Sequence, residues 1–259
     1  MFKMTRRFIK LTIIELKLFF RAPIATFFTF IFPLLYLLLV MEVLVEQKEI
    51  AVLINKNELL NLHVINYVIP SLIILIIATT SIMGIPSLLV NYREISYFKR
   101  LIATTLTPFT ILTSLMTAYL IITFIGITLV IIAGKVFYQA QFEGKVFLFF
   151  AGLMISFISL SSLGFVIASL CRTIRTAVAV SYIVFFPMLL FSGILLSFQK
   201  IPGWLSFSGA FVPATYGVNL LNGLWFGEPF VALLNEILIL IGIFLCGGFI
   251  SIRTFHWEL

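Results

Sequence analysis

Six long apolar runs divide this chain and restrict its fold more than any other feature. Each is close to the roughly 20 residues that an α-helix needs to cross about 30 Å of hydrocarbon. The first run is too long for the apolar core of a signal peptide and lacks a small-x-small cleavage site, so we interpret it as a retained span. The predicted spans cover about residues 22–44, 63–90, 108–134, 144–170, 177–198 and 229–252.

The composition excludes a water-soluble domain of this size. Hydrophobic residues make up 62% of the 259 positions and charged residues 10%, whereas soluble domains carry about 25% charged residues. No aspartate occurs, and the ten acidic residues are all glutamate. We predict an all-α membrane protein that forms a single transmembrane domain over residues 1–259, with six transmembrane helices.

The basic residues predict which way the spans are oriented. Twelve of the 17 lie in the N-terminal segment, in the connections after the second and fourth spans, and at the C-terminus. Five lie in the remaining connections. By the positive-inside rule both termini are cytoplasmic. The net charge of +7 is too small and too scattered to indicate a nucleic-acid partner.

Residues 1–21 have the pattern of an amphipathic helix. Drawn as a helix, one arc of about 100° holds the basic side chains Lys3, Arg6, Arg7, Lys10, Lys17 and Arg21. The far side holds Phe2, Phe8, Ile9, Thr12, Leu16, Phe19 and Phe20. This arrangement predicts a helix lying in the inner membrane interface. A basic anchor that only sets the topology is the alternative.

The connection at 199–227 is far longer than a hairpin between two spans requires, and it is rich in Gly, Pro and apolar residues. We expect short re-entrant helices that dip into the outer leaflet, packed against protein so that their backbone groups are satisfied. The alternative is an interfacial loop anchored by Trp204 and Trp225.

The sequence gives no support for nucleotide hydrolysis by this chain. The Gly-Lys pairs at 134–135 and 144–145 have Leu129 and Gln139 where a P-loop requires its first glycine. Without aspartate there is no Walker-B acid. We therefore expect no ATP hydrolysis by this chain alone.

Other catalytic chemistry is equally unsupported. His63 and His256 fall at opposite membrane faces in the predicted topology, and neither has a second ligand at a useful spacing. Cys171 and Cys246 belong to no metal-like spacing, and we interpret both as free thiols. We predict no enzyme activity, no catalytic residue, no metal and no cofactor bound by this chain.

Polar residues inside the spans are candidates for a transport path. Glu236, beside Asn235, is either an ion-coupling acid or a side chain that reaches the outer interface. Hydroxyl residues either line a path or bond back to the preceding helical turn. These residues are Thr79, Thr80, Ser81, Ser156, Ser159, Ser161, Ser162 and Ser181.

Proline and glycine predict local helix geometry. Pro108 and Pro229 suit the first turn of a helix, whereas Pro33, Pro86 and Pro187 lie inside spans and should kink them. Close helix packing is predicted where small residues recur four apart. These pairs are Gly164-xxx-Ala168, Gly242-xxx-Cys246 and Gly247-xxx-Ser251.

The stretch at 91–108, NYREISYFKRLIATTLTP, mixes charge with aromatic residues on the predicted cytoplasmic side. Such a mixture suits a short helix that docks into a groove of a partner protein. A solvated connector that only adds positive charge is the equal alternative from the residues themselves.

These features together resemble the permease subunit of type-2 ABC exporters, the ABC-2 family, over nearly the whole chain. The resemblance rests on the amphipathic N-terminal helix, the six spans, and two motif regions in the family's order and spacing. The motif residues are Arg93-Glu94, Arg100-Leu101, Ala103-Thr104, Ser192-Gly193, Pro202, Pro213 and Tyr216.

The resemblance implies a bacterial cytoplasmic-membrane protein that pairs with a second permease copy, as a homodimer or heterodimer, among membrane lipids. Two cytoplasmic ABC ATPase subunits would bind ATP and Mg²⁺, while residues 91–107 and the N-terminal elbow helix would contact them. In the family pattern Glu94 either pairs with a nearby base or caps the coupling helix. The implied ATPase-coupling residues are Tyr92, Arg93, Glu94, Tyr97, Phe98, Lys99 and Arg100.

The resemblance also implies that the second and fifth spans line the path and that residues 199–227 are the family's re-entrant helices. The path residues are then Thr79, Thr80, Ser81, Ser181 and Ser192. The outer-gate residues are Pro202, Trp204, Pro213 and Tyr216.

The expected substrate is a hydrophobic or amphipathic compound, such as a drug, an antibiotic or a lipid-like molecule. The first outer loop, residues 45–62, is too short for the large external domain of some lipid and sodium exporters, and the features of polysaccharide permeases are not evident. Three alternatives stay open: a secondary transporter or channel that needs no ATPase, a polysaccharide or lipid flippase permease, and a structural or immunity role.

Overall fold

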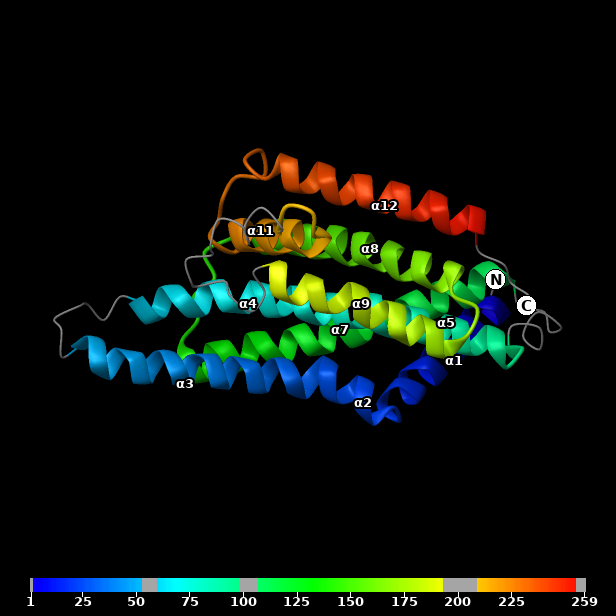
Figure 1. The fold of residues 1–259 in the computed structure, drawn as a ribbon, viewed down its shortest axis with the longest axis horizontal. Helices are drawn as coiled ribbons and strands as arrows, with labels where there is room; N and C mark the ends of the chain where they lie inside the picture. The colour runs from blue at the N-terminus through cyan, green and yellow to red at the C-terminus, as the bar shows by residue number, and fades with distance from the viewer. Residues whose placement is uncertain (1, 53–59, 98–106, 193–208, 255–259) are drawn as a thin grey trace.

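The computed structural model describes residues 2–52, 60–97, 107–192 and 209–254. All of the described secondary structure is helical, and most helices lie along the long axis of one bundle (Figure 1). The elements are α1 (Phe2–Phe20), α2 (Pro23–Thr26), η1 (Phe27–Ile31), α3 (Phe32–Val52), α4 (Leu60–Ala78), η2 (Thr79–Gly84), α5 (Ile85–Glu94), α7 (Pro108–Tyr138), α8 (Val146–Leu170), α9 (Ile174–Phe191), α11 (Pro213–Trp225) and α12 (Leu234–Thr254).

Six helical segments are long and apolar enough to cross a membrane, which confirms the predicted number of spans. The second of them comprises α4, η2 and α5. The segments are Pro23–Glu42, Ile65–Glu94, Thr110–Tyr138, Val146–Leu170, Ile174–Phe191 and Leu234–Thr254.

The second span forms the centre of the bundle. Within it 89% of the apolar window is buried, against 17% in the last span. Ile69, Leu72 and Ile73 of α4 are completely enclosed. Large apolar side chains on the outside, such as Phe249 and Ile252 of α12, are exposed instead. A surface of this kind is stable in hydrocarbon, so the distribution fits a multi-pass membrane protein.

Two π-helical segments interrupt the first and second spans at matching places. Pro33 lies two residues after η1, and Pro86 lies two residues after η2. Proline lacks a backbone N–H and clashes with the preceding turn, and a widened turn relieves both problems. The predicted disturbance at these prolines is therefore a π segment. Pro187, in contrast, lies within the continuous helix α9.

The two prolines that were expected to open helices have different outcomes. Thr107 accepts a hydrogen bond from the Thr110 amide at 3.3 Å, just before Pro108 at the start of α7. Pro229 was expected to open the last helix in the same way, but this expectation is wrong. The residues after Pro229 form turns, in which the Ala232 amide donates to the Pro229 carbonyl at 2.9 Å. Helix α12 begins only at Leu234.

Glycines permit two close helix approaches. A Cβ on Gly164 of α8 would collide with the Ser81 carbonyl of η2, and one on Gly247 of α12 would lie 2.6 Å from the Ser162 Oγ. The packing predicted for these two glycines is confirmed. Gly242 was expected to pack in the same way, but among the described residues nothing lies within 4 Å of its Cβ position, so it does not pack against another described helix.

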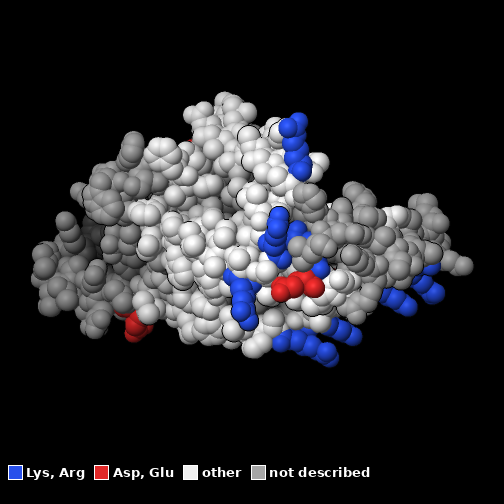
Figure 2. All heavy atoms as spheres, turned by 45° about the vertical axis from the view of Figure 1, so that its right-hand side comes forward, with Lys and Arg blue, Asp and Glu red and all other residues white. Residues whose placement is uncertain are grey.

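The predicted N-terminal helix forms, as α1, and packs against α7. Its buried side chains are Leu11, Thr12, Glu15 and Phe19. Figure 1 shows that α1 and the C-terminal end of α12 lie at the same end of the bundle. Figure 2 shows blue Lys and Arg side chains gathered around that end. Exposed basic residues in the described part of the chain include Arg7, Lys10, Lys17, Arg172, Arg175 and Arg253.

The segment at 199–227 contains one described helix, α11, which packs against α4, α8 and α12. Trp225 is 2% exposed, its ring contacts Phe142 and Phe149, and its Nε1 donates to the Gln141 carbonyl at 2.9 Å. An interfacial anchor would be exposed, so that alternative is wrong for Trp225. Trp204 lies outside the described residues. The expectation that this segment dips into the outer leaflet stays a prediction.

Candidate transport pocket and coupling contacts

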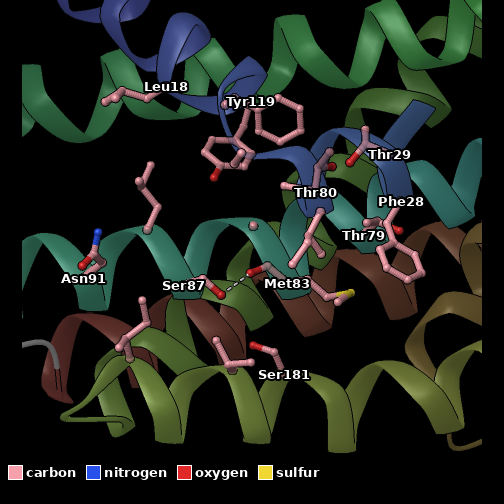
Figure 3. A pocket seen from close by; sticks show the side chains of 18 of the residues that line it. Leu18, Phe28, Thr29, Thr79, Thr80, Met83, Ser87, Asn91, Tyr119 and Ser181 are labelled. Carbon is pink, nitrogen blue, oxygen red and sulfur yellow. Dashed lines mark hydrogen bonds between the residues drawn. The ribbon is translucent and has the colours of Figure 1, made fainter. Parts of the chain in front are cut away.

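A pocket of about 400 Å³ lies in the half of the bundle that carries α1. It is bounded by the bend from α1 through α2 to η1, by η2 and α5 of the second span, and by α9 of the fifth span. Helix α7 adds one side chain, Tyr119 (Figure 3). This volume is within the range of pockets that hold drug-sized molecules.

The two π segments form part of the pocket wall. Thr29 comes from η1, while Thr79, Thr80, Met83 and Gly84 come from η2. A Cβ on Gly84 would lie 2.5 Å from the Tyr119 ring, so a larger residue here would require the ring to move. Irregular helical turns at matching heights thus shape the space between the two spans.

The pocket is mainly apolar, with a few convergent polar groups. Ser87 is occupied by a 2.6 Å hydrogen bond to the Met83 carbonyl. The Ser181 Oγ is buried and has no hydrogen-bond partner among the residues that the structure describes. Figure 3 shows Ser181 and Tyr119 on opposite sides of the pocket, with α5 between their helices.

One carboxylate lies in the pocket wall, that of Glu15 from α1. The side chain is 5% exposed, and the Tyr92 hydroxyl donates to its Oε2 at 2.8 Å. Burial raises the pKa of Glu15 above its ordinary value, and the hydrogen bond from Tyr92 partly opposes this shift. A buried acid among apolar and hydroxyl groups is typical of a site with a function.

Three of the predicted path residues meet at this pocket, namely Thr79, Thr80 and Ser181. Both threonines also bond back along their helix, to the Leu75 carbonyl at 2.8 Å and the Ile76 carbonyl at 2.9 Å. The same hydroxyl can therefore line the pocket and bond back to the preceding helical turn. That these residues line a transport path stays a prediction.

The other two predicted path residues lie elsewhere. Ser81 is buried away from the pocket, where its hydroxyl is 3.0 Å from that of Ser161 on α8. Ser192 lines a second cavity of about 520 Å³, which the last turn of α9 and α11 enclose with the start of α12. Glu236 and Glu228 line this second cavity as well.

The predicted gate residues are only partly described. Pro213 is the first residue of α11, and the Tyr216 hydroxyl donates to the Ala210 carbonyl at 2.6 Å. Pro202 and Trp204 lie outside the described residues.

The coupling residues that the structure describes tie the end of α5 to the turn between α8 and α9. The Arg93 guanidinium donates to the Ala168 carbonyl at 3.0 Å and to the Cys171 carbonyl, both at the C-terminal end of α8. The exposed Glu94 carboxylate accepts a 2.9 Å hydrogen bond from the Ile174 amide, the first residue of α9. Helix ends favour these charges, positive beside carbonyls and negative beside amides.

The remaining coupling residues give less information. The Tyr97 ring lies 4.4 Å from the Tyr92 ring, centroid to centroid. Phe98, Lys99 and Arg100 lie outside the described residues, as does most of the coupling segment at 91–107. Whether Glu94 pairs with a nearby base or caps a coupling helix therefore stays a prediction. The helix end that Glu94 does meet is that of α9.

Sequence reasoning missed Glu15 and Tyr119. A usable signal for Glu15 was present, because it lies four residues from both Leu11 and Phe19 and so shares their helix face. An acid at such a position in a basic helix indicates a buried contact. Tyr119 carried no comparable signal, since aromatic residues are frequent along the whole chain.

The fold and the pocket define a class, that of multi-pass α-helical membrane proteins with an internal site between spans. The family model for the ABC-2 type transporter matches residues 6–226, and the chain therefore belongs to this family. The family is one of transporter permeases, which are not enzymes in themselves.

Curated relatives of known name are also similar to this chain. It is 32% identical over 140 residues to the probable multidrug ABC transporter permease YbhR of Escherichia coli K12, and equally to that of Escherichia coli O157:H7. The match covers 54% of this chain and 38% of each relative, so it spans well under half of the curated proteins.

Proposed function

We propose that this chain is the membrane-spanning subunit of an ATP-driven exporter that moves a hydrophobic or amphipathic compound outward. The observation that carries this proposal is the pocket between the first, second and fifth spans, which is mainly apolar and large enough for a drug-sized compound. Membership of the ABC-2 family supports it, as does the name of the Escherichia coli relatives.

In this proposal, ATP and Mg²⁺ are bound by separate cytoplasmic ABC ATPase subunits, and a second permease copy completes the transporter in the bacterial cell membrane. The concentration of basic side chains around α1 and the C-terminal end of α12 supports a cytoplasmic position for both termini.

The contacts of Arg93 and Glu94 suggest how coupling would work. They link the second span to the turn before the fifth span, and both spans line the pocket. A force applied by the ATPase to residues 91–107 would therefore reach both of these walls together. The link is direct, through hydrogen bonds at two helix ends.

The coupling assignment is tested by copurification with a partner ABC ATPase subunit, and by export from cells. We expect Glu94→Ala combined with Arg100→Ala to abolish export while the permease still folds. Glu94→Gln keeps an oxygen that accepts from the Ile174 amide but removes the negative charge. It therefore separates the effect of the hydrogen bond at the start of α9 from the effect of the charge. Glu143→Gln, at an exposed position in the turn before α8, is the control. No copurification together with unchanged export by the double variant would refute the assignment.

A secondary transporter remains the rival function, because Glu236 lines the second cavity. Such a transporter would lose its activity in Glu236→Gln and keep it when the ATPase is deleted. The proposal made here predicts the opposite pattern in the same export assay.

A further inference from the structure

The pocket between α1, η2 and α9 carries a single charge in its described wall, the Glu15 carboxylate. Exposed basic side chains of α1, such as Lys10 and Lys17, do not line it. An anionic headgroup would therefore meet a like charge inside the pocket. A cation would meet an opposite charge in surroundings where water screens little.

Among the residues that the structure describes, no positively charged side chain is paired with the Glu15 carboxylate. Tyr92 donates one neutral hydrogen bond to it. Arg93, the next residue, is directed to the carbonyls at the end of α8. Isolated buried carboxylates are costly, and a positively charged ligand would offset that cost.

Aromatic rings and a hydroxyl complete a binding surface for such a ligand. Phe19, Phe28, Tyr119 and Tyr182 line the pocket, and faces of aromatic rings attract cations. The Ser181 Oγ, buried and without a partner in the described chain, adds an acceptor on the opposite wall.

Two exposed residues of the lining are apolar. Leu18 and Ile24, which flank the bend between α1 and α2, line the pocket and are 41% and 68% exposed. They offer apolar contacts to the body of a ligand that approaches from lipid.

We propose that this pocket binds bulky organic monocations with an apolar or aromatic body, and that Glu15 is the residue that selects for the positive charge. The inference rests on the proposed function, since it names the kind of compound that the exporter carries. The pocket would select ligands by their charge and their volume. Permanently charged phosphonium and ammonium compounds should therefore both bind.

The test is binding of radiolabelled tetraphenylphosphonium to the purified permease in nanodiscs, with empty nanodiscs subtracted and no ATPase present. We expect saturable binding that methyltriphenylphosphonium displaces and that neutral triphenylphosphine oxide does not. Glu15→Gln keeps an acceptor for Tyr92 and removes the charge. We expect it to weaken binding at least about tenfold, because a desolvated charge pair is lost.

Two matched comparisons isolate charge and volume. Glu143→Gln removes an exposed carboxylate that does not line the pocket, and it should bind as tightly as the wild type. Val178→Phe narrows the pocket without changing any charge, whereas Val180→Phe alters an exposed valine of the same helix outside the lining. We expect only the former of these two to lose binding, and this comparison decides the question if Glu15→Gln does not fold.

Three results would overturn the inference: no saturable binding by the wild type, Glu15→Gln binding within about twofold of it, or equal displacement by the neutral oxide. Because no ATPase takes part, these failures are separate from failure of the proposed function. ATP-dependent export of neutral amphiphiles without phosphonium binding would leave the exporter intact and refute only the cation site.

Discussion

Two glutamates show how differently a carboxylate can be placed in an apolar protein. Glu94 is exposed and meets the amide end of α9, where its charge is favourable. Glu15 is buried beside Tyr92, and nothing in the described chain neutralises it. The charge of Glu94 therefore stabilises the fold at neutral pH. The charge of Glu15, in contrast, lowers the stability of the fold, and this residue lies in the wall of the pocket.

The raised pKa of Glu15 predicts a pH-dependent difference between the wild type and Glu15→Gln. The folded state holds the proton more tightly than the unfolded chain, so ionisation above the ordinary glutamate pKa destabilises the fold. Among the described groups near it, Tyr92 donates a hydrogen bond to the carboxylate, and the basic side chains of α1 whose burial is described are exposed.

We therefore expect Glu15→Gln to gain thermal stability relative to the wild type as the pH rises from about 5 to about 8. Melting curves of both proteins in detergent, without a cationic ligand, measure this difference. Glu143→Gln, at an exposed position, controls for the general effect of charge. A wild type that gains stability relative to Glu15→Gln over this range would contradict the account.

At the residue scale, Thr79 and Thr80 were selected as polar residues inside a span, and both lie in the wall of the pocket. Their role in a transport path stays a prediction. Glu15 was missed because its significance depends on α5 and α7, which pack against α1 from distant parts of the sequence.

At the scale of helices, the close approach of α8 to η2 depends on one missing side chain. Gly164→Ala would place a methyl group against the Ser81 carbonyl, which is backbone and moves only with its helix. We expect a loss of about 1–3 kcal/mol of stability, as for other overpacked cores. Gly242→Ala is the control, because its Cβ position is open.

Unfolding in detergent measures both glycine variants. The Gly242→Ala variant should stay within about 0.5 kcal/mol of the wild type. Equal stability of the two variants would show that α8 and η2 are not packed as closely as described.

The helices themselves were predictable because their length and hydropathy are set by the thickness of the membrane. The π segments were not, since proline indicates a disturbance of the helix and leaves its form open. Pro33 and Pro86 gave π turns, whereas Pro187 lies in a continuous helix. Whether a proline is accommodated by a π turn or within a continuous helix depends on how neighbouring helices pack. The periodicity of the sequence does not reveal that packing.

At the scale of the whole molecule, labelling can test the proposed orientation of the chain in the membrane. In a variant without Cys171 and Cys246, we expect Lys10→Cys to react with a membrane-impermeant maleimide only after the cells are opened. Lys145→Cys, exposed in the turn before α8, should react in intact cells. The reverse pattern of labelling would invert the proposed orientation.

The architecture of the whole chain was the most predictable level, because six apolar runs leave few alternatives. The pocket was not predictable, since it arises where the bend after α1 meets two spans that lie far away in the sequence. Its chemistry, and with it the class of compound carried, emerges only from that arrangement.

The central claim is that ATP hydrolysis on a partner subunit drives transport through this chain. The direct measurement is accumulation of ethidium in inside-out proteoliposomes that contain the permease and its partner ABC ATPase. We predict accumulation that requires ATP and Mg²⁺, ceases with a hydrolysis-deficient ATPase, and persists with a proton uncoupler. Accumulation that proceeds without the ATPase, or that the uncoupler abolishes, would contradict the account.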